Sequence, residues 1–125
     1  MDGRELHDAA TAAAQELPGM ALEYPFGPDW DVFKVRGKVF LLQTVLRGSE
    51  LVTVKAHPDD AVALRAEFPE ISSGYHMNKR HWISLRPGPS LSEPLVREVV
   101  TESYLRVVET LPRAIRPVDP ARFGR

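Results

Sequence analysis

Twelve consecutive residues concentrate the side chains that could do chemistry, and they run Gly74-Tyr75-His76-Met77-Asn78-Lys79-Arg80-His81-Trp82-Ile83-Ser84-Leu85. This cationic segment holds two histidines, two cations, an amide and two large aromatic rings, and it contains no acid. Lys79 and Arg80 can contact phosphates, while His76 and Asn78 can hydrogen-bond to bases or sugars. The rings of Tyr75 and Trp82 can stack on bases. The segment therefore favours a binding site for nucleic acid.

The second half of the cationic segment alternates like a strand. Trp82 and Ser84 would lie on one face, and His81, Ile83 and Leu85 on the other. We therefore expect a short loop that leads into a strand. A structural interpretation stays open beside the functional one, in which Trp82 packs in the core and the cations line a solvated edge.

Other kinds of site have little support in the sequence. There is no cysteine, which excludes disulfides and thiolate metal sites. Neither a G-x-S-x-G turn nor a phosphate-binding or dinucleotide-binding glycine motif occurs. The histidines His76 and His81 are five residues apart in a segment that cannot be one regular helix, so we expect no metal site, no cofactor and no catalytic residue. An enzyme that uses His76 or His81 as a general base stays as an alternative, and it would need an orienting carboxylate.

Size and charge limit the class of protein further. A chain of 125 residues with 43% hydrophobic and 26% charged residues is typical of one globular domain. No apolar run is long enough to span a membrane, and the acidic N-terminus does not resemble a signal peptide, so we expect a cytoplasmic protein. The net charge of −1 argues against a protein that wraps duplex DNA.

The order of predicted elements indicates an α+β fold, in which an antiparallel sheet packs with three helices. We expect an N-terminal helix capped by Asp2, a middle helix that begins near Pro58, and a long C-terminal helix capped by Ser92. The sheet would consist of a three-strand meander, with turns at Gly37 and Gly48, plus a later strand from the cationic segment. Residues 1–116 would form the single domain, and residues 117–125 a flexible tail.

The stretch from Ala21 to Trp30 combines two prolines, glycine and three aromatic rings, which indicates an ordered, non-repetitive loop. Its main structural interpretation is a lid over one end of the core. In an alternative function, the loop Tyr24–Trp30 and the segment Tyr75–Trp82 would line one pocket for a small anionic ligand or a protein partner. His76, Asn78 and Arg80 would then orient the ligand.

Several of these motifs together resemble one known family. Tyr24-Pro25-Phe26-Gly27, the hairpin Val32 to Phe40, the run Gly74 to Trp82, Ser103-Tyr104 and Leu111-Pro112 are similar to the MmcQ/YjbR family, over roughly Leu6 to Arg116. The resemblance implies a CyaY-like α+β domain in which two β wings bind DNA.

The resemblance also implies which residues form the site. The matching positions are Tyr75, His76, Asn78, Lys79, Arg80, His81 and Trp82, together with Lys34 and Lys38 in the first hairpin. The expected function is therefore DNA binding without catalysis.

Overall fold

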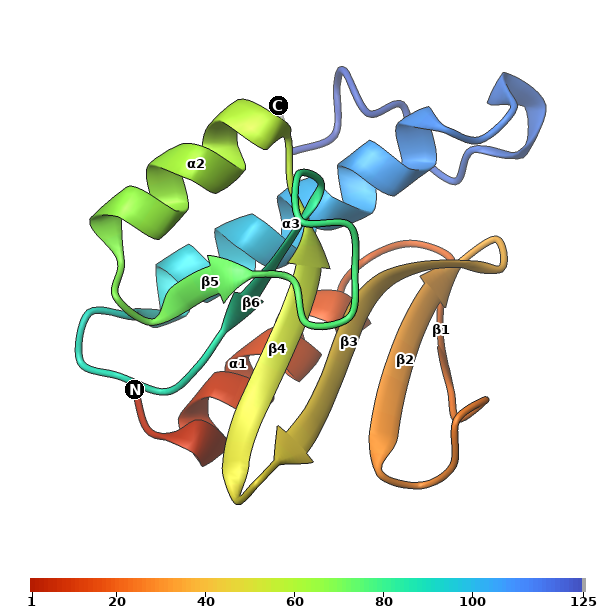
Figure 1. The fold of residues 1–125 in the computed structure, drawn as a ribbon. Coiled ribbons are helices and arrows are strands. Elements are labelled where there is room, and N and C mark those ends of the chain that lie inside the picture. Colours follow the sequence, from red (N-terminus) through yellow and green to blue (C-terminus); the bar gives the residue numbers. More distant parts are fainter. Residues whose placement is uncertain (125) are drawn as a thin grey trace.

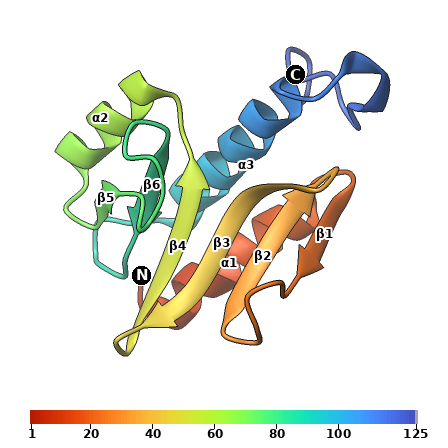
Figure 2. The ribbon, with the colours of Figure 1, turned by 45° about the vertical axis from the view of Figure 1, so that its right-hand side comes forward.

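The computed structural model describes residues 1–124 and contains one six-stranded antiparallel sheet and three α-helices (Figure 1). Across the sheet the strands are ordered β1-β2-β3-β4-β6-β5, so β1 and β5 form the two edges (Figure 2). The strands are β1 (Met20–Glu23), β2 (Trp30–Val35), β3 (Lys38–Leu46), β4 (Ser49–Lys55), β5 (Ile71–Ser73) and β6 (Trp82–Leu85). The helices are α1 (Gly3–Gln15), α2 (Pro58–Glu67) and α3 (Glu93–Glu109), followed by the 3-10 turn η1 (Arg113–Ile115).

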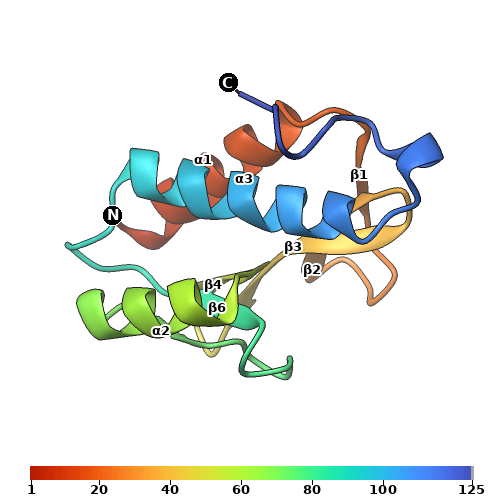
Figure 3. The same cartoon turned by 90° about the horizontal axis from the view of Figure 1, so that it is seen from above.

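Helices α1 and α3 pack against each other and cover one face of the sheet (Figure 3). Asp2 caps α1 by accepting a hydrogen bond from the Glu5 N–H, and the Glu5 side chain returns one to the Asp2 N–H. Ser92 caps α3 in the same way at the Leu95 N–H. These caps satisfy backbone donors that a helix leaves free at its start. Helix α2 lies apart from this pair and packs on the β5 edge.

Two tight turns build the central meander. Arg36 and Gly37 have φ angles of 50° and 80°, and Arg47 and Gly48 have 53° and 78°. Two consecutive positive φ values are the mark of the hairpin turn whose twist matches that of the flanking strands. The two glycines adopt this conformation without steric cost, which fixes the registers of β2 with β3 and of β3 with β4.

The main core lies between the sheet and the helix pair. Phe33, Phe40 and Tyr104 are fully buried there, and the Phe40 and Tyr104 rings meet edge to face with centroids 5.4 Å apart. The Tyr104 hydroxyl donates a hydrogen bond to the Pro18 carbonyl at 2.5 Å, and burial raises the pKa of this phenol. Each buried side chain of this size contributes roughly 1.5–3 kcal/mol relative to exposure.

The fold class expected from the sequence is confirmed, including the meander, the later strand and the three helices. Two strands were not predicted. The stretch from Ala21 to Trp30 was expected to be non-repetitive, but its start belongs to β1, which pairs with β2. Strand β5 likewise lies just before the cationic segment, where no strand was expected. Leu51 and Thr53 of β4 are buried as well.

Part of the expected tail lies against the rest of the fold. Val118 and Phe123 pack on the core, and the Phe123 ring lies 6.1 Å from that of Tyr104. Its mobility stays a prediction, and the last tail residue, Arg125, lies outside the described residues. Across residues 1–124, no helix has the length and apolar character that crossing a membrane requires.

Candidate nucleic-acid interface

Residues 74–81 connect β5 to β6 and are called the cationic loop below. Its ends are joined by a hydrogen bond from the Gly74 N–H to the Trp82 carbonyl at 2.9 Å. A Cβ atom on residue 74 would lie 2.6 Å from the Trp82 Cβ, so only glycine fits without displacement. The loop is therefore closed by a backbone hydrogen bond. At this point two segments of the chain approach too closely to leave room for a side chain on residue 74.

Hydrogen bonds within the loop fix its path. The Asn78 carbonyl accepts from the N–H groups of His81 and Trp82 at 3.2 and 3.0 Å, and the Asn78 side-chain oxygen accepts from the Arg80 N–H at 2.9 Å. His76 has a φ of 55°, in the left-handed region that few residues other than glycine adopt. Its ring lies 4.1 Å from that of Tyr75. These contacts give the loop a defined shape.

The sheet anchors the loop through a buried hydroxyl pair. Ser84 Oγ accepts a hydrogen bond from the Tyr75 N–H at 3.0 Å and shares another with Thr53 Oγ1 at 2.8 Å. Both hydroxyl residues are buried. On the other side of the loop, the Ala56 N–H donates to the His81 carbonyl at 2.8 Å. The loop is thus held at both ends by strands β4 and β6.

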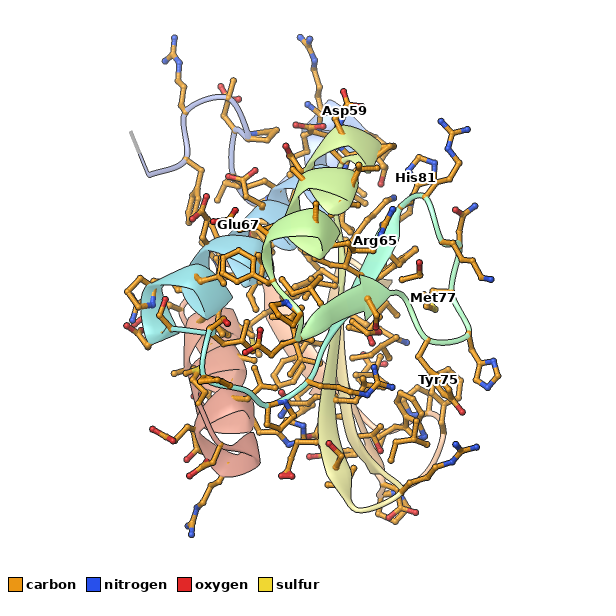
Figure 4. The ribbon with its side chains drawn as sticks, turned by 60° about the vertical axis from the view of Figure 1, so that its left-hand side comes forward. Asp59, Arg65, Glu67, Tyr75, Met77 and His81 are labelled. Carbon is orange, nitrogen blue, oxygen red and sulfur yellow. The ribbon has the colours of Figure 1, made fainter. Side chains whose placement is uncertain are left out.

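The polar side chains of the loop face solvent. His76, Asn78, Lys79 and Arg80 are exposed, while Tyr75, His81 and Trp82 are half-buried. In Figure 4, Tyr75 and Met77 extend on the side of the molecule away from α1 and α3. In the described part of the chain, neither Lys79 nor Arg80 forms an ion pair. Two free cations therefore lie beside two partly exposed rings.

The two lysines expected from the first hairpin differ in their contacts. Lys34 forms an ion pair with Glu23 of β1 at 3.0 Å, so its charge is largely offset. Lys38 is exposed, and its ammonium donates to the Thr110 hydroxyl at 3.2 Å. Strand β4 runs antiparallel to both β3 and β6, so Lys38 and Trp82 begin their strands at the same end of the sheet. They stand about two interstrand spacings, or roughly 10 Å, apart across the sheet.

The pocket expected between the Tyr24–Trp30 loop and the Tyr75–Trp82 segment is not supported. Trp30 pairs with Thr44 near the end of the sheet where β4 begins, whereas Trp82 pairs with Lys55 where β4 finishes. The two segments reach the sheet from opposite ends, with β3 and β4 between them. The lid expected from the Ala21–Trp30 stretch is also wrong, because Tyr24 and Phe26 are 51% and 67% exposed.

Sequence reasoning missed the residues that support the loop. Gly74 and Ser84 carry no charge and no ring, so nothing in the pattern of the cationic segment singled them out. A serine inside an otherwise apolar strand was the available signal, because a buried hydroxyl needs a hydrogen-bond partner.

The fold and the loop define an α+β domain with a six-stranded antiparallel sheet and a hydrogen-bonded, cationic connection between β5 and β6. The family model named YjbR matches residues 15–106 of this chain. The chain belongs to the YjbR family, which confirms the resemblance drawn from its motifs.

Two Escherichia coli proteins illustrate the similarity. Uncharacterized protein YbdF of strain O157:H7 is 44% identical over 111 residues, which cover 89% of this chain and 91% of YbdF. Uncharacterized protein YjbR of strain K12 is 28% identical over 90 residues, or 70% of this chain and 76% of YjbR.

Solved structures agree with the fold. The crystal structure of Deinococcus radiodurans protein DR2400 is similar with a TM-score of 0.80 and 28% identity, covering 88% of this chain and 84% of that one. A crystal structure of a Pseudomonas syringae protein has a TM-score of 0.64 and 24% identity, with coverage of 82% and 96%.

Proposed function

We propose that this protein binds DNA without catalysing a reaction, and that the cationic loop is its main contact surface. The observation that carries the proposal is the pair of exposed cations Lys79 and Arg80, which form no ion pair among residues 1–124 and lie on a loop whose backbone is hydrogen-bonded. A preorganised loop loses little conformational entropy when it binds, which favours affinity.

Each loop residue has a role that follows from its chemistry. Lys79 and Arg80 contact phosphates, and His76 and Asn78 hydrogen-bond to bases or sugars. Tyr75 and Trp82 offer the exposed parts of their rings for stacking, and His81 lies at the base of the loop. Lys38 can add a further phosphate contact from the neighbouring hairpin. Lys34 contributes less, because Glu23 offsets its charge.

Binding is favoured over general-base catalysis by the surroundings of the two histidines. A catalytic histidine is normally oriented by a carboxylate. Among residues 1–124, the rings of His76 and His81 have no such hydrogen bond or ion pair. A DNA-binding role also implies the cytoplasm as the place of action.

The proposal can be tested by fluorescence anisotropy. Labelled duplex and single-stranded DNA would each be titrated with the protein at two salt concentrations. We expect affinity to fall steeply with salt, and the double variant Lys79→Ala/Arg80→Ala to lose most of the binding and part of the salt dependence. The charge-matched control is Arg4→Ala/Arg97→Ala, which removes two exposed cations from α1 and α3.

Absence of binding at low salt would overturn the proposal. If both double variants lost the same amount of DNA-binding affinity, only the net charge of the protein would matter. The cationic loop would then not be the contact surface. Comparison of duplex with single strand separates phosphate contacts from ring stacking, because unpaired bases expose their faces.

A further inference from the structure

A cavity of about 640 Å³ lies between α2 and α3, away from the cationic loop's exposed side chains. Its floor is apolar and is formed by side chains from both helices and the sheet, namely Leu64, Phe68, Ile83, Leu95, Val99 and Leu105. This volume is within the range of sites for small organic ligands. Helix α2 packs on the β5 edge and lies beside α3 as a separate element (Figure 3). The cavity is lined by residues of both helices.

Two cations line one end of this cavity without an acidic partner. Lys55 and Arg106 both border it, and in the part of the chain that the structure describes neither lies within 4 Å of a carboxylate oxygen. Arg106 Nε is buried and has no hydrogen-bond partner among residues 1–124. The Arg106 side chain as a whole is only half-buried and borders the cavity, so the rest of its guanidinium can donate to a ligand there.

The fold holds these cations in place. The Lys55 N–H donates to Ser103 Oγ at 2.8 Å, and the Lys38 ammonium donates to Thr110 Oγ1. Ser103, Arg106 and Thr110 follow each other at helical spacings of three and four, so they share one side of α3. Burial first, and then the charges of Arg106 and Lys38, lower the pKa of Lys55. The charges of Lys55, Arg106 and Lys38 are therefore close enough to act on one another.

Acids border the same cavity, and two of them, Glu102 and Glu109, lie about one helical turn from Arg106. Asp60 and Glu67 border it from α2, and Glu98, Glu102 and Glu109 border it from α3; all five are exposed, as is His57. These negative charges repel a polyanion such as nucleic acid. A ligand with a single anionic group meets less of this repulsion, and its apolar body can lie on the floor of the cavity.

We infer that the cavity between α2 and α3 binds a small amphiphilic carboxylate, with its head group on Arg106 and Lys55 and its apolar body on the floor. The head group accepts charge-assisted hydrogen bonds from the half-buried Arg106 guanidinium and the Lys55 ammonium. The body covers the apolar side chains contributed by Leu64, Phe68 and Leu105. This site is separate from the proposed DNA-binding loop and does not depend on it.

The test is a titration of the ¹⁵N-labelled protein with sodium octanoate, followed by NMR, with 1-octanol as the uncharged probe of equal length. We expect octanoate to shift amide resonances of α2, α3 and the end of β4. Octanol should bind at least about tenfold more weakly, because a charge-assisted hydrogen bond is lost. Equal binding of the two probes, or no shift with either, would overturn the inference.

Variants assign the head-group site. Arg106→Gln and Lys55→Gln should each weaken octanoate binding about tenfold, while Lys79→Gln in the cationic loop should leave it unchanged. Glu102→Gln removes a negative charge one helical turn from Arg106 and should tighten binding, and this result stays informative even if Arg106→Gln folds poorly. An unchanged affinity in both Arg106→Gln and Glu102→Gln would contradict the site.

Discussion

The hydroxyl of Ser103 joins α3 to two strands. It accepts from the Lys55 N–H at 2.8 Å and donates to the Phe40 carbonyl at 2.6 Å, and the residue is fully buried. We expect Ser103→Ala to lower the free energy of unfolding by about 1–3 kcal/mol, because two buried backbone groups lose their partner. Urea denaturation would measure the loss. Thr101→Ala, on the same helix, is the control, and an equal effect of the two substitutions would contradict this explanation.

Glu70 connects the segment after β6 to the N-terminus. Its carboxylate accepts from the Ser90 N–H at 2.7 Å, and the Met1 ammonium donates to the neighbouring Gly88 carbonyl. Burial alone would raise the pKa of Glu70, but the bonds from Ser90 and its own N–H, with the N-terminal charge, hold it below the ordinary 4.5. Because the pKa is lower in the folded state, the ionised Glu70 carboxylate adds to the free energy of unfolding above pH 4.5. This added stability is lost as the pH falls below that value.

Glu70→Gln should therefore destabilise the protein at pH 7, with a difference from wild type that shrinks at pH 3. Urea denaturation at several pH values between 3 and 7 would measure this difference in the free energy of unfolding. Glu67→Gln, an exposed neighbour on α2, provides the comparison. A constant difference between Glu70→Gln and wild type at all pH values would show that the carboxylate's ionisation is not involved.

The contacts of single residues were the least predictable from the sequence. Lys34 looked like a free cation, and its pairing with Glu23 depends on the register of β1 with β2. The proximity of Lys55 to Arg106 depends on how α3 crosses the sheet. Lys55 and Arg106 are far apart in the chain, and Glu23 lies on an edge strand. No local sequence pattern therefore reveals either pair.

At the scale of elements, the sequence predicted most where local chemistry is decisive. The caps at Asp2 and Ser92 and the turn glycines Gly37 and Gly48 each satisfy a backbone requirement within a few residues, and all four lie where expected. Strands β1 and β5 are short and lie at the edges of the sheet, where alternation of buried and exposed residues is weak. Their assignment depends on a neighbour strand, which a local pattern does not specify.

The cationic loop depends on the close approach at Gly74. We expect Gly74→Ala to push the Trp82 backbone away, to lower the free energy of unfolding by about 1–3 kcal/mol and to speed amide exchange in residues 74–82. Hydrogen exchange followed by NMR would show both the location and the size of the change. Ser73→Ala, one residue earlier, serves as the control, and uniform protection in Gly74→Ala would contradict the role given to this glycine.

At the scale of the whole molecule, the C-terminal residues extend the main core. Phe123 lies half-buried beside Tyr104, and Arg36 Nε donates to the Ile115 carbonyl at 2.9 Å. Phe123→Ala should lower the free energy of unfolding by about 1 kcal/mol, since part of its apolar surface would be lost from the core. Phe26→Ala, at a position that is 67% exposed, should change it little. If thermal denaturation showed an equally small effect for Phe123→Ala and Phe26→Ala, the C-terminal residues would add no stability.

The closure of the cationic loop at Gly74 and Trp82 has a consequence for diversity among relatives. The residues between these two points contribute little to the main core, while the bonds that close the loop come mostly from the backbone. Residues 75–81 therefore form an insert whose side chains, apart from the Asn78 amide that helps to fix the loop, can change without rebuilding the main core. Exchange of the insert between two members would transfer the binding preference of one to the other.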